Sequence, residues 1–246
     1  MPDHRSAGSN TGNTPPMLSI RDLHAWYGES HVLHNINLDV QQGECITLLG
    51  RNGAGRTTTL RAILGLTGKR TGSIKVAGKE VIDLPPHKIA RLGLGYCPEE
   101  RGIYASLTAE ENLTLLPMVG PNGMSLEQIY EMFPNLKERA NSPGTRLSGG
   151  EQQMLAMARI LRTGAQLLLL DEITEGLAPV IVQKLGQVIR ELKARNFTMV
   201  LVEQNFRFAQ HLADRHYVIE HGEVVEVIER AEVEAKQDRL TELLGI

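Results

Sequence analysis

The sequence has few cysteines, no long apolar run and no surplus of basic charge. Its two cysteines, Cys45 and Cys97, show no CxxC or Cys/His spacing, so we expect neither a disulfide framework nor a zinc site. No stretch approaches the roughly 20 apolar residues that a membrane-spanning helix needs. The 26 Lys and Arg residues stand against 29 Asp and Glu residues. This balance argues against a protein that works by neutralising many phosphates of a nucleic acid.

The length of 246 residues fits one large α/β domain, with room for a small inserted lobe. Residues 1–16 are rich in Gly, Ser, Asn, Thr and Pro and lack the apolar core of a secretory signal. We therefore predict a disordered tail on a cytoplasmic protein, followed by a single domain over residues 17–246. Residues 220–246 hold eight acidic residues against three basic ones. We interpret this acidic C-terminal segment as a solvated amphipathic surface.

Three short apolar runs, at residues 45–49, 167–170 and 198–202, are each followed by a polar loop and a helical pattern. Continuous apolar runs of this length are expected for strands buried on both faces of a parallel sheet. Upstream, residues 18–23, 32–40 and 73–76 show β-type alternation, which favours an antiparallel sheet beside the parallel core. The predicted fold class is therefore α/β, with a parallel sheet and an antiparallel β subdomain.

The sequence pattern in the middle of the chain predicts helices. We expect them to form a small inserted lobe from about residue 107 to 143, within a helical subdomain of about 100–163. Thr108 begins one helical pattern, and Ser125 with Gln128 three residues later fits a capping box at the start of another. The pair Pro134-Asn135 is expected to end that segment.

The most specific motif lies between the run 45–49 and an amphipathic helical pattern. Glycines there let backbone N–H groups face a phosphate, and the helix N-terminus adds partial positive charge, as in a P-loop nucleotide-binding core. The alternative is a glycine-rich turn that only caps a helix. Arg56 stands where a P-loop usually has Lys, and the two are not interchangeable at a tight phosphate site. The candidate nucleotide-binding residues are Gly50, Arg51, Asn52, Gly53, Ala54, Gly55, Arg56, Thr57 and Thr58, with the Thr57 hydroxyl as a ligand for Mg²⁺.

The run 167–170 ends in two carboxylates, Asp171 and Glu172, at the end of a strand where α/β sheets place their ligands. Neighbouring strand residues point to opposite faces, so we expect the two to have different roles. Asp171 suits Mg²⁺ coordination, and Glu172 suits polarising an attacking water. The alternative is a pair of ordinary helix-capping acids.

Between these motifs lies the sequence LSGGEQQ, in which Ser148 and Glu151 form a capping box. Gly149 and Gly150 fall in the first helical turn, where each costs about 1 kcal/mol relative to Ala. Such glycines are useful if a phosphate approaches the backbone closely.

The P-loop, LSGGEQQ and LLLLDE, in this order, resemble the ATP-binding cassette (ABC) subunits of membrane transporters, over about residues 18–227. The resemblance implies a head-to-tail dimer in which ATP at one P-loop is closed over by Ser148, Gly149 and Gly150 of the other subunit. It also implies ATP hydrolysis, with ATP and Mg²⁺ bound. The acidic C-terminal segment follows the last predicted strand, and this position lets it lie outside the nucleotide site, where its carboxylates would otherwise repel ATP.

Three further positions take their roles from the resemblance. Tyr27 matches the aromatic residue that stacks on adenine, with a merely packed aromatic as the alternative. Glu99 stands where most cassettes have the Gln that links Mg²⁺ and the catalytic water to the transporter interface. Gln204 stands where most have the His that contacts the γ-phosphate, and a neutral amide donates a hydrogen bond there without carrying charge.

Details of these motifs look like the subunits of branched-chain amino acid importers: Pro98-Glu99, Val202-Glu203-Gln204 and Glu175-Gly176-Leu177-Ala178-Pro179. That resemblance implies transmembrane permease subunits, a second identical or paralogous cassette and, indirectly, a solute-binding protein outside the membrane. The chain would then lie peripherally on the inner face of the cell membrane. It would touch the permease through residues 99–103 and the lobe 107–143.

Three alternatives remain open. In the first, the same machine serves a related solute such as urea or a short amide, because other subunits select the solute. The second is a slow or non-hydrolysing cassette gated by the nucleotide, a hypothesis motivated by Arg56 and Gln204. A soluble cassette acting on DNA or ribosomes is the third, against which stand the lack of a basic surplus and of a long coiled-coil insertion.

Overall fold

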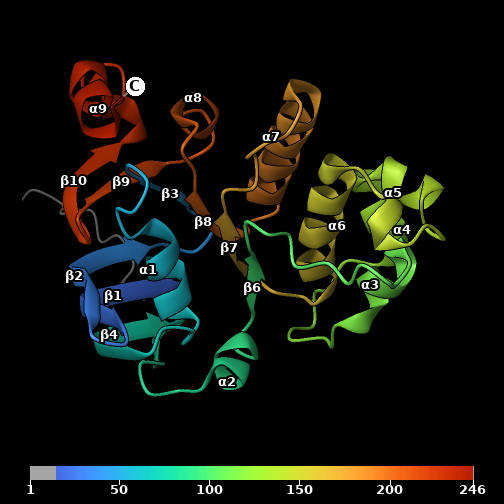
Figure 1. Cartoon of the computed structure of the whole chain (residues 1–246), viewed down its shortest axis with the longest axis horizontal. Helices are drawn as coiled ribbons and strands as arrows, with labels where there is room; N and C mark the ends of the chain where they lie inside the picture. Colours follow the sequence, from blue (N-terminus) through green and yellow to red (C-terminus); the bar gives the residue numbers. More distant parts are fainter. Residues whose placement is uncertain (1–14, 246) are drawn as a thin grey trace, which may run out of the picture.

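The structure is a computed structural model that describes residues 15–245. The predicted tail at residues 1–16 therefore lies almost wholly outside the described part. Within it, the strands form two sheets, and the helices cover them and build a separate lobe (Figure 1). The antiparallel sheet has the order β2-β1-β4-β5, and it contains β1 (Leu18–Tyr27), β2 (Ser30–Val40), β4 (Lys69–Val76) and β5 (Lys79–Glu80).

The larger sheet has the order β10-β9-β3-β8-β7-β6. All neighbours in it pair in parallel except β9 and β10, which form an antiparallel hairpin at one edge. The three predicted core strands are confirmed, and every residue of each is buried. The strands are β3 (Cys45–Leu49), β6 (Leu94–Cys97), β7 (Leu167–Asp171), β8 (Thr198–Val202), β9 (Arg215–Glu220) and β10 (Glu223–Glu229).

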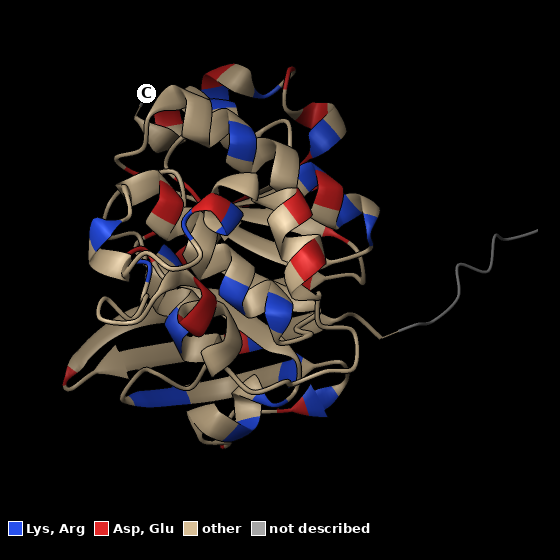
Figure 2. Ribbon diagram, turned by 90° about the vertical axis from the view of Figure 1, so that its right-hand side faces the viewer, with Lys and Arg blue, Asp and Glu red and all other residues tan. Residues whose placement is uncertain are grey.

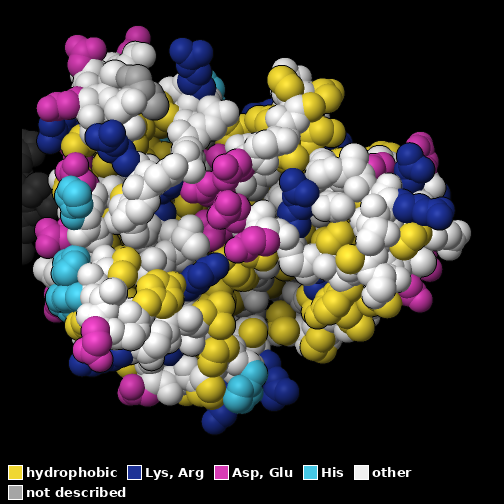
Figure 3. All heavy atoms as spheres, viewed as in Figure 1, with side chains coloured by type: hydrophobic (Ala, Val, Ile, Leu, Met, Phe, Trp, Pro, Cys, Tyr) yellow, Lys and Arg dark blue, Asp and Glu magenta, His cyan; other side chains and the backbone are white. Residues whose placement is uncertain are grey.

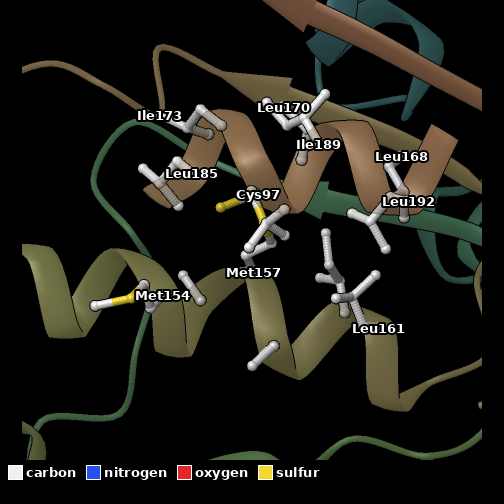
Figure 4. Packing of buried hydrophobic residues seen from close by; sticks show 14 of the residues in the cluster. Cys97, Met154, Met157, Leu161, Leu168, Leu170, Ile173, Leu185, Ile189 and Leu192 are labelled. Atoms are coloured by element: carbon white, nitrogen blue, oxygen red, sulfur yellow. The ribbon is translucent and has the colours of Figure 1, made fainter. Parts of the chain in front are cut away.

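Alternate side chains of these strands enter two different cores, which explains their continuous apolar character. Leu167 and Leu169 pack with the antiparallel sheet and α1 (Arg56–Ile63). Leu168 and Leu170 pack on the opposite face, against α6 (Gly149–Arg162) and α7 (Pro179–Ala194). Figure 4 shows the side chains of these two helices meeting over the strands.

The predicted helical lobe is present as α3 (Ala109–Leu115), α4 (Leu126–Met132) and α5 (Pro134–Glu138), packed on α6. The Thr108 and Ser125 side chains both complete capping boxes. The expectation for Pro134 is half correct. α4 does end just before it, but Pro134 is the first residue of α5. Proline is tolerated there because the N–H that it lacks would have no hydrogen-bond partner in the first turn of a helix.

The acidic C-terminal segment is ordered and pairs its charges internally. Glu226 lies within salt-bridge distance of Lys236 and Arg239, at 3.4 Å from each, and Arg239 also pairs with Glu242 at 2.6 Å. Leu240 of α9 (Gln237–Leu244) is buried against a small core that includes Phe206 of α8 (Phe206–Ala209). The segment therefore forms part of the domain, including strand β10, and is more than a solvated surface.

The rest of the described chain adds little to the site. α2 (Pro86–Ala90) and two 3-10 turns, Gly144–Arg146 and Arg230–Glu232, complete the elements. Both cysteines are buried as free thiols. Among the residues described, no helix is long and apolar enough to cross a membrane. Basic and acidic residues alternate along the ribbon over the side of the molecule seen in Figure 2.

Candidate functional site

The P-loop runs from the end of β3 to the first turn of α1. Gly55 caps this helix with a φ of 109°, no side chain accepts its first N–H groups, and its first turn holds no acidic residue. A side chain at Gly50 would place its Cβ only 2.3 Å from the carbonyl oxygen of Ile219, so the loop needs glycine there. The start of α1 thus offers backbone donors and a positive dipole end to an anion.

A cavity of about 480 Å³ opens beside this loop and brings together most of the predicted site. Tyr27 comes from the end of β1, Glu99 from the loop after β6, and Gln204 from the loop after β8. Val32 comes from β2, and Glu172 and Glu175 come from the loop after β7. The P-loop and α1 contribute Asn52, Gly53, Ala54, Gly55, Arg56, Thr57 and Thr58.

Asp171, the last residue of β7, is 1% exposed and is absent from the described lining of this cavity. Its carboxylate accepts hydrogen bonds from the Thr57 hydroxyl and from the Tyr96 hydroxyl, each at 3.0 Å. Burial raises the pKa of Asp171, and these two hydrogen bonds oppose that rise. Thr57 and Asp171 therefore present two hard oxygen atoms side by side, a donor set that fits Mg²⁺.

Glu172 does not continue the strand, and the expectation that the two carboxylates point to opposite faces is wrong. Its φ of 46° is left-handed, so the chain turns and both carboxylates reach consecutive residues of α1. The Glu172 carboxylate pairs with the Arg56 guanidinium at 3.0 Å and accepts a hydrogen bond from the Gln204 amide at 2.9 Å. The partners of Asp171 and Glu172 differ, as different roles require.

Arg56 is 5% exposed and lies inside the site. One terminal nitrogen, Nη2, contacts Glu172 and also donates to the Asn52 side chain at 3.3 Å. The other, Nη1, is buried without a hydrogen-bond partner. A buried guanidinium nitrogen with no acceptor is costly, so this donor fits a ligand oxygen such as that of a phosphate.

Three carboxylates crowd the mouth of the cavity. Ligand oxygens of Glu99, Glu172 and Glu175 lie within 4.8 Å of one another. A hydrogen bond with the neighbouring Glu172 carboxyl raises the pKa of Glu175. Figure 3 shows acidic side chains gathered in the middle of this face, between the β-rich part and the helical lobe. This concentration of negative charge attracts cations and repels an unaccompanied triphosphate.

Not every candidate residue lines the main cavity. Gly50 and Arg51 border a neighbouring cavity of about 360 Å³, together with Leu244 of α9. Through Leu244 the C-terminal segment reaches the P-loop, but none of its described residues lines the main cavity, and its acidic side chains line neither cavity. This position is in line with the expectation that the segment lies outside the nucleotide site.

Ser148, Gly149 and Gly150 are absent from the described lining of the cavity. They begin α6, where the Ser148 side chain caps the helix and Gly150 packs beside Ile181 of α7. A Cβ on Gly150 would lie 2.9 Å from that isoleucine side chain. Packing is therefore one reason for glycine at position 150, in addition to any ligand.

Sequence reasoning missed several residues of the site. Tyr96, which binds Asp171, occupies strand β6 just before the Pro98-Glu99 turn, and its position beside a strand end was the available signal. Val32 lines the cavity from a position without motif character, and Glu175, the first residue of the motif Glu175-Gly176-Leu177-Ala178-Pro179, was not among the candidate site residues. Glu203, beside Gln204, is 2% exposed, and no spacing rule marks a buried carboxyl at this position.

Comparison with known proteins is consistent with this geometry. A family model described as ABC transporter matches residues 33–175. The high-affinity branched-chain amino acid transport ATP-binding protein BraG of Pseudomonas aeruginosa is 41% identical over 212 residues, which is 85% of this chain and 91% of that protein. A probable branched-chain amino acid transport ATP-binding protein, LivF of Archaeoglobus fulgidus, is 36% identical over 216 residues, 85% of this chain and 90% of its own length.

Among solved structures, a dimeric ATP-binding cassette in a post-hydrolysis state, bound to ADP and Pi, superposes with a TM-score of 0.76. Its sequence is 26% identical, and the match covers 87% of this chain and 99% of that one.

Proposed function

This chain belongs to the ABC transporter family as an ATP-binding subunit, and on that basis we propose that it uses MgATP to power the import of branched-chain amino acids through a separate permease. It is an ATP hydrolase of the transport type. The observation that carries the proposed mechanism is the position of Glu172, held by Arg56 and Gln204 at the mouth of the P-loop cavity.

The residues around the cavity divide the binding of ATP between them. The N–H groups of the P-loop and the unpartnered Arg56 Nη1 bind the phosphates, while Tyr27, 38% exposed at the cavity edge, stacks on the adenine. Thr57 and Asp171 would hold Mg²⁺, with Glu99 of the loop after β6 as a further candidate ligand. When bound, Mg²⁺ would neutralise charge on the phosphates.

Glu172 is the proposed general base that polarises the attacking water. The ion pair with Arg56 occupies its carboxylate in the present structure. A γ-phosphate entering the P-loop competes for the same guanidinium, because phosphate and carboxylate are both bidentate partners of arginine. Binding of ATP therefore releases Glu172 for the water, while Gln204 keeps it in place through the amide hydrogen bond.

We expect Glu172→Gln to lower kcat at least about 100-fold while nucleotide binding persists, because the amide cannot take a proton from water and the phosphate-binding loop is untouched. Phosphate release and binding of a fluorescent ATP analogue measure the two effects. Glu100→Gln, which changes an exposed carboxylate outside the cavity, is the matched control. Normal turnover by Glu172→Gln would refute the proposed role.

The dimer is proposed to complete the site with Ser148, Gly149 and Gly150 of the second subunit. Support comes from the exposed position of Ser148 at the N-terminus of α6, where N–H groups and the helix dipole suit a phosphate. The related cassette bound to ADP and Pi is dimeric.

Ser148→Arg should abolish turnover and ATP-dependent dimerisation without preventing ATP from binding to the P-loop of the same subunit. Ser125→Arg is a matched control, because it also removes the capping serine of a short helix, α4, at a cost of about 1 kcal/mol. Light scattering and nucleotide titration separate the effects. Loss of ATP binding in folded Ser148→Arg would contradict a site shared between two subunits.

A second candidate function is a cassette that clamps ATP but hydrolyses it slowly. The buried Arg56–Glu172 ion pair favours it, because the general base is occupied by the residue that replaces the usual lysine. A lysine at this position would carry a compact ammonium group in place of the longer, planar guanidinium whose Nη2 contacts Glu172.

On this basis Arg56→Lys should raise kcat about three- to tenfold, which corresponds to releasing about 1 kcal/mol of ground-state stabilisation. Steady-state phosphate release by both proteins, at saturating MgATP, measures it. Ordinary transporter turnover by the parent with no gain in the variant would remove the slow-cassette hypothesis.

The solute and the partners rest on the two branched-chain relatives. Leu115 and Met118, which are 48% and 56% exposed on the lobe, support its proposed use, with residues 99–103, as the permease-docking surface. Figure 3 shows hydrophobic side chains gathered there. In this assembly the chain lies on the inner face of the membrane.

Purification of the native membrane complex should recover two permease subunits and a second cassette. We expect the solute-binding protein that stimulates its ATPase activity to bind leucine, isoleucine or valine, as measured by calorimetry. Selective binding of urea or a short amide would reassign the solute and leave the ATPase mechanism unchanged.

A further inference from the structure

Glu203 is a buried carboxyl group that the mechanism above does not use. It follows the last residue of β8, directly before Gln204, and is 2% exposed. Its Oε2 accepts a hydrogen bond from the Thr174 hydroxyl at 2.8 Å. Its Oε1 is buried and has no partner. A small cavity of about 150 Å³ beside it is lined by Glu172, Thr174, Glu175, Glu203, Gln204 and Asn205.

The hydrogen bond from Thr174 connects the two loops that hold the catalytic group. Thr174 lies two residues after Glu172 in the loop that follows β7, and Gln204 comes next after Glu203 in the loop that follows β8. Glu172 and Gln204 are themselves joined by a hydrogen bond of 2.9 Å. Two parallel links, one at Glu203 and one at Gln204, therefore fix the distance between these loops.

The charges around Glu203 decide whether its carboxyl group is more stable neutral or ionised. Glu172 and Glu175 face the small cavity from the loop after β7, and Arg56 is the cation on the P-loop side. Arg56 already pairs with Glu172. An ionised Glu203 would be a further negative charge in this cluster, with one oxygen buried and unpartnered, which is unfavourable.

We infer that Glu203 is a positioning residue for ATP hydrolysis, which ties the loop of Glu172 to the loop of Gln204 through its hydrogen bond with Thr174 and which slows turnover when it ionises. Burial raises the pKa of Glu203 to about 7, against the opposing effect of the Thr174 hydrogen bonds. Its ionisation therefore falls in the physiological range. The inference rests on the proposed role of Glu172 as general base.

The ionised form is expected to be the slow one for a simple electrostatic reason. It repels the Glu172 carboxylate and the γ-phosphate that must approach each other across the attacking water, and it competes with both for Arg56. The sign follows: kcat is highest below the pKa of Glu203 and falls as the pH rises through it. Bound ATP adds negative charge, so the inflection in the complex lies at or above pH 7.

The test is the pH profile of kcat from pH 6 to 9 for the parent, Glu203→Gln and Thr174→Val. The parent should lose about five- to tenfold in kcat across an inflection at or above pH 7. Glu203→Gln, which mimics the neutral acid, should stay near the acidic plateau of the parent at every pH. Thr174→Val, which removes a hydrogen bond that favours the charged form, should keep the inflection and move it to higher pH.

An unchanged inflection in Glu203→Gln, or no inflection in the parent, would overturn the inference, as would a folded Glu203→Gln that is inactive throughout. If that variant does not fold, Thr174→Val decides, and an inflection that does not move counts against Glu203. Glu172→Gln in the same series separates the two proposals. Normal turnover by Glu172→Gln would refute the role of Glu172 as general base. If Glu172→Gln is inactive but Glu203→Gln keeps the same pH profile as the parent, only the Glu203 inference is refuted.

Discussion

The parallel pairing of β3, β8 and β7 is the constraint on which the site depends. In a parallel sheet the carboxyl ends of all strands reach the same edge, and here that edge carries the P-loop, Gln204 and Asp171. The register aligns Asp171 with Val202, so the two loops that follow them leave the sheet side by side. Burial on both faces keeps this edge rigid, since every residue of the three strands is packed.

The chemistry of the site is governed by an excess of negative charge around one buried cation. Glu172, Glu175 and Glu203 lie near Arg56, and Asp171 binds the next residue, Thr57. Burial or a neighbouring carboxyl raises the pKa of Asp171, Glu175 and Glu203. Such a site suits a ligand that carries its own counter-ion, as the proposed MgATP does. Replacement of lysine by arginine at position 56 gives the carboxylates a partner in the absence of that ligand.

The other parts of the molecule surround the carboxyl end of the parallel sheet. The antiparallel sheet brings Tyr27 and Val32 to the cavity, and the loop after β6 brings Glu99. The helical lobe stands away from the cavity and presents its own exposed apolar side chains. The C-terminal segment completes the central sheet with β10 and reaches the back of the P-loop through Leu244.

The local pattern of the chain was enough to predict the buried strands, the capping boxes and the P-loop, because each of these depends on residues that are neighbours in sequence. The order of the motifs was enough to identify the family. Only the tertiary structure decided which side chains meet: Tyr96 on Asp171, Arg56 on Glu172, and Thr174 on Glu203. These pairs join residues from 29 to 116 positions apart, and the left-handed turn at Glu172 that permits one of them has no sequence signal. Sequence periodicity reports which face of an element is buried, whereas contacts between loops depend on how the strands are ordered in the sheet.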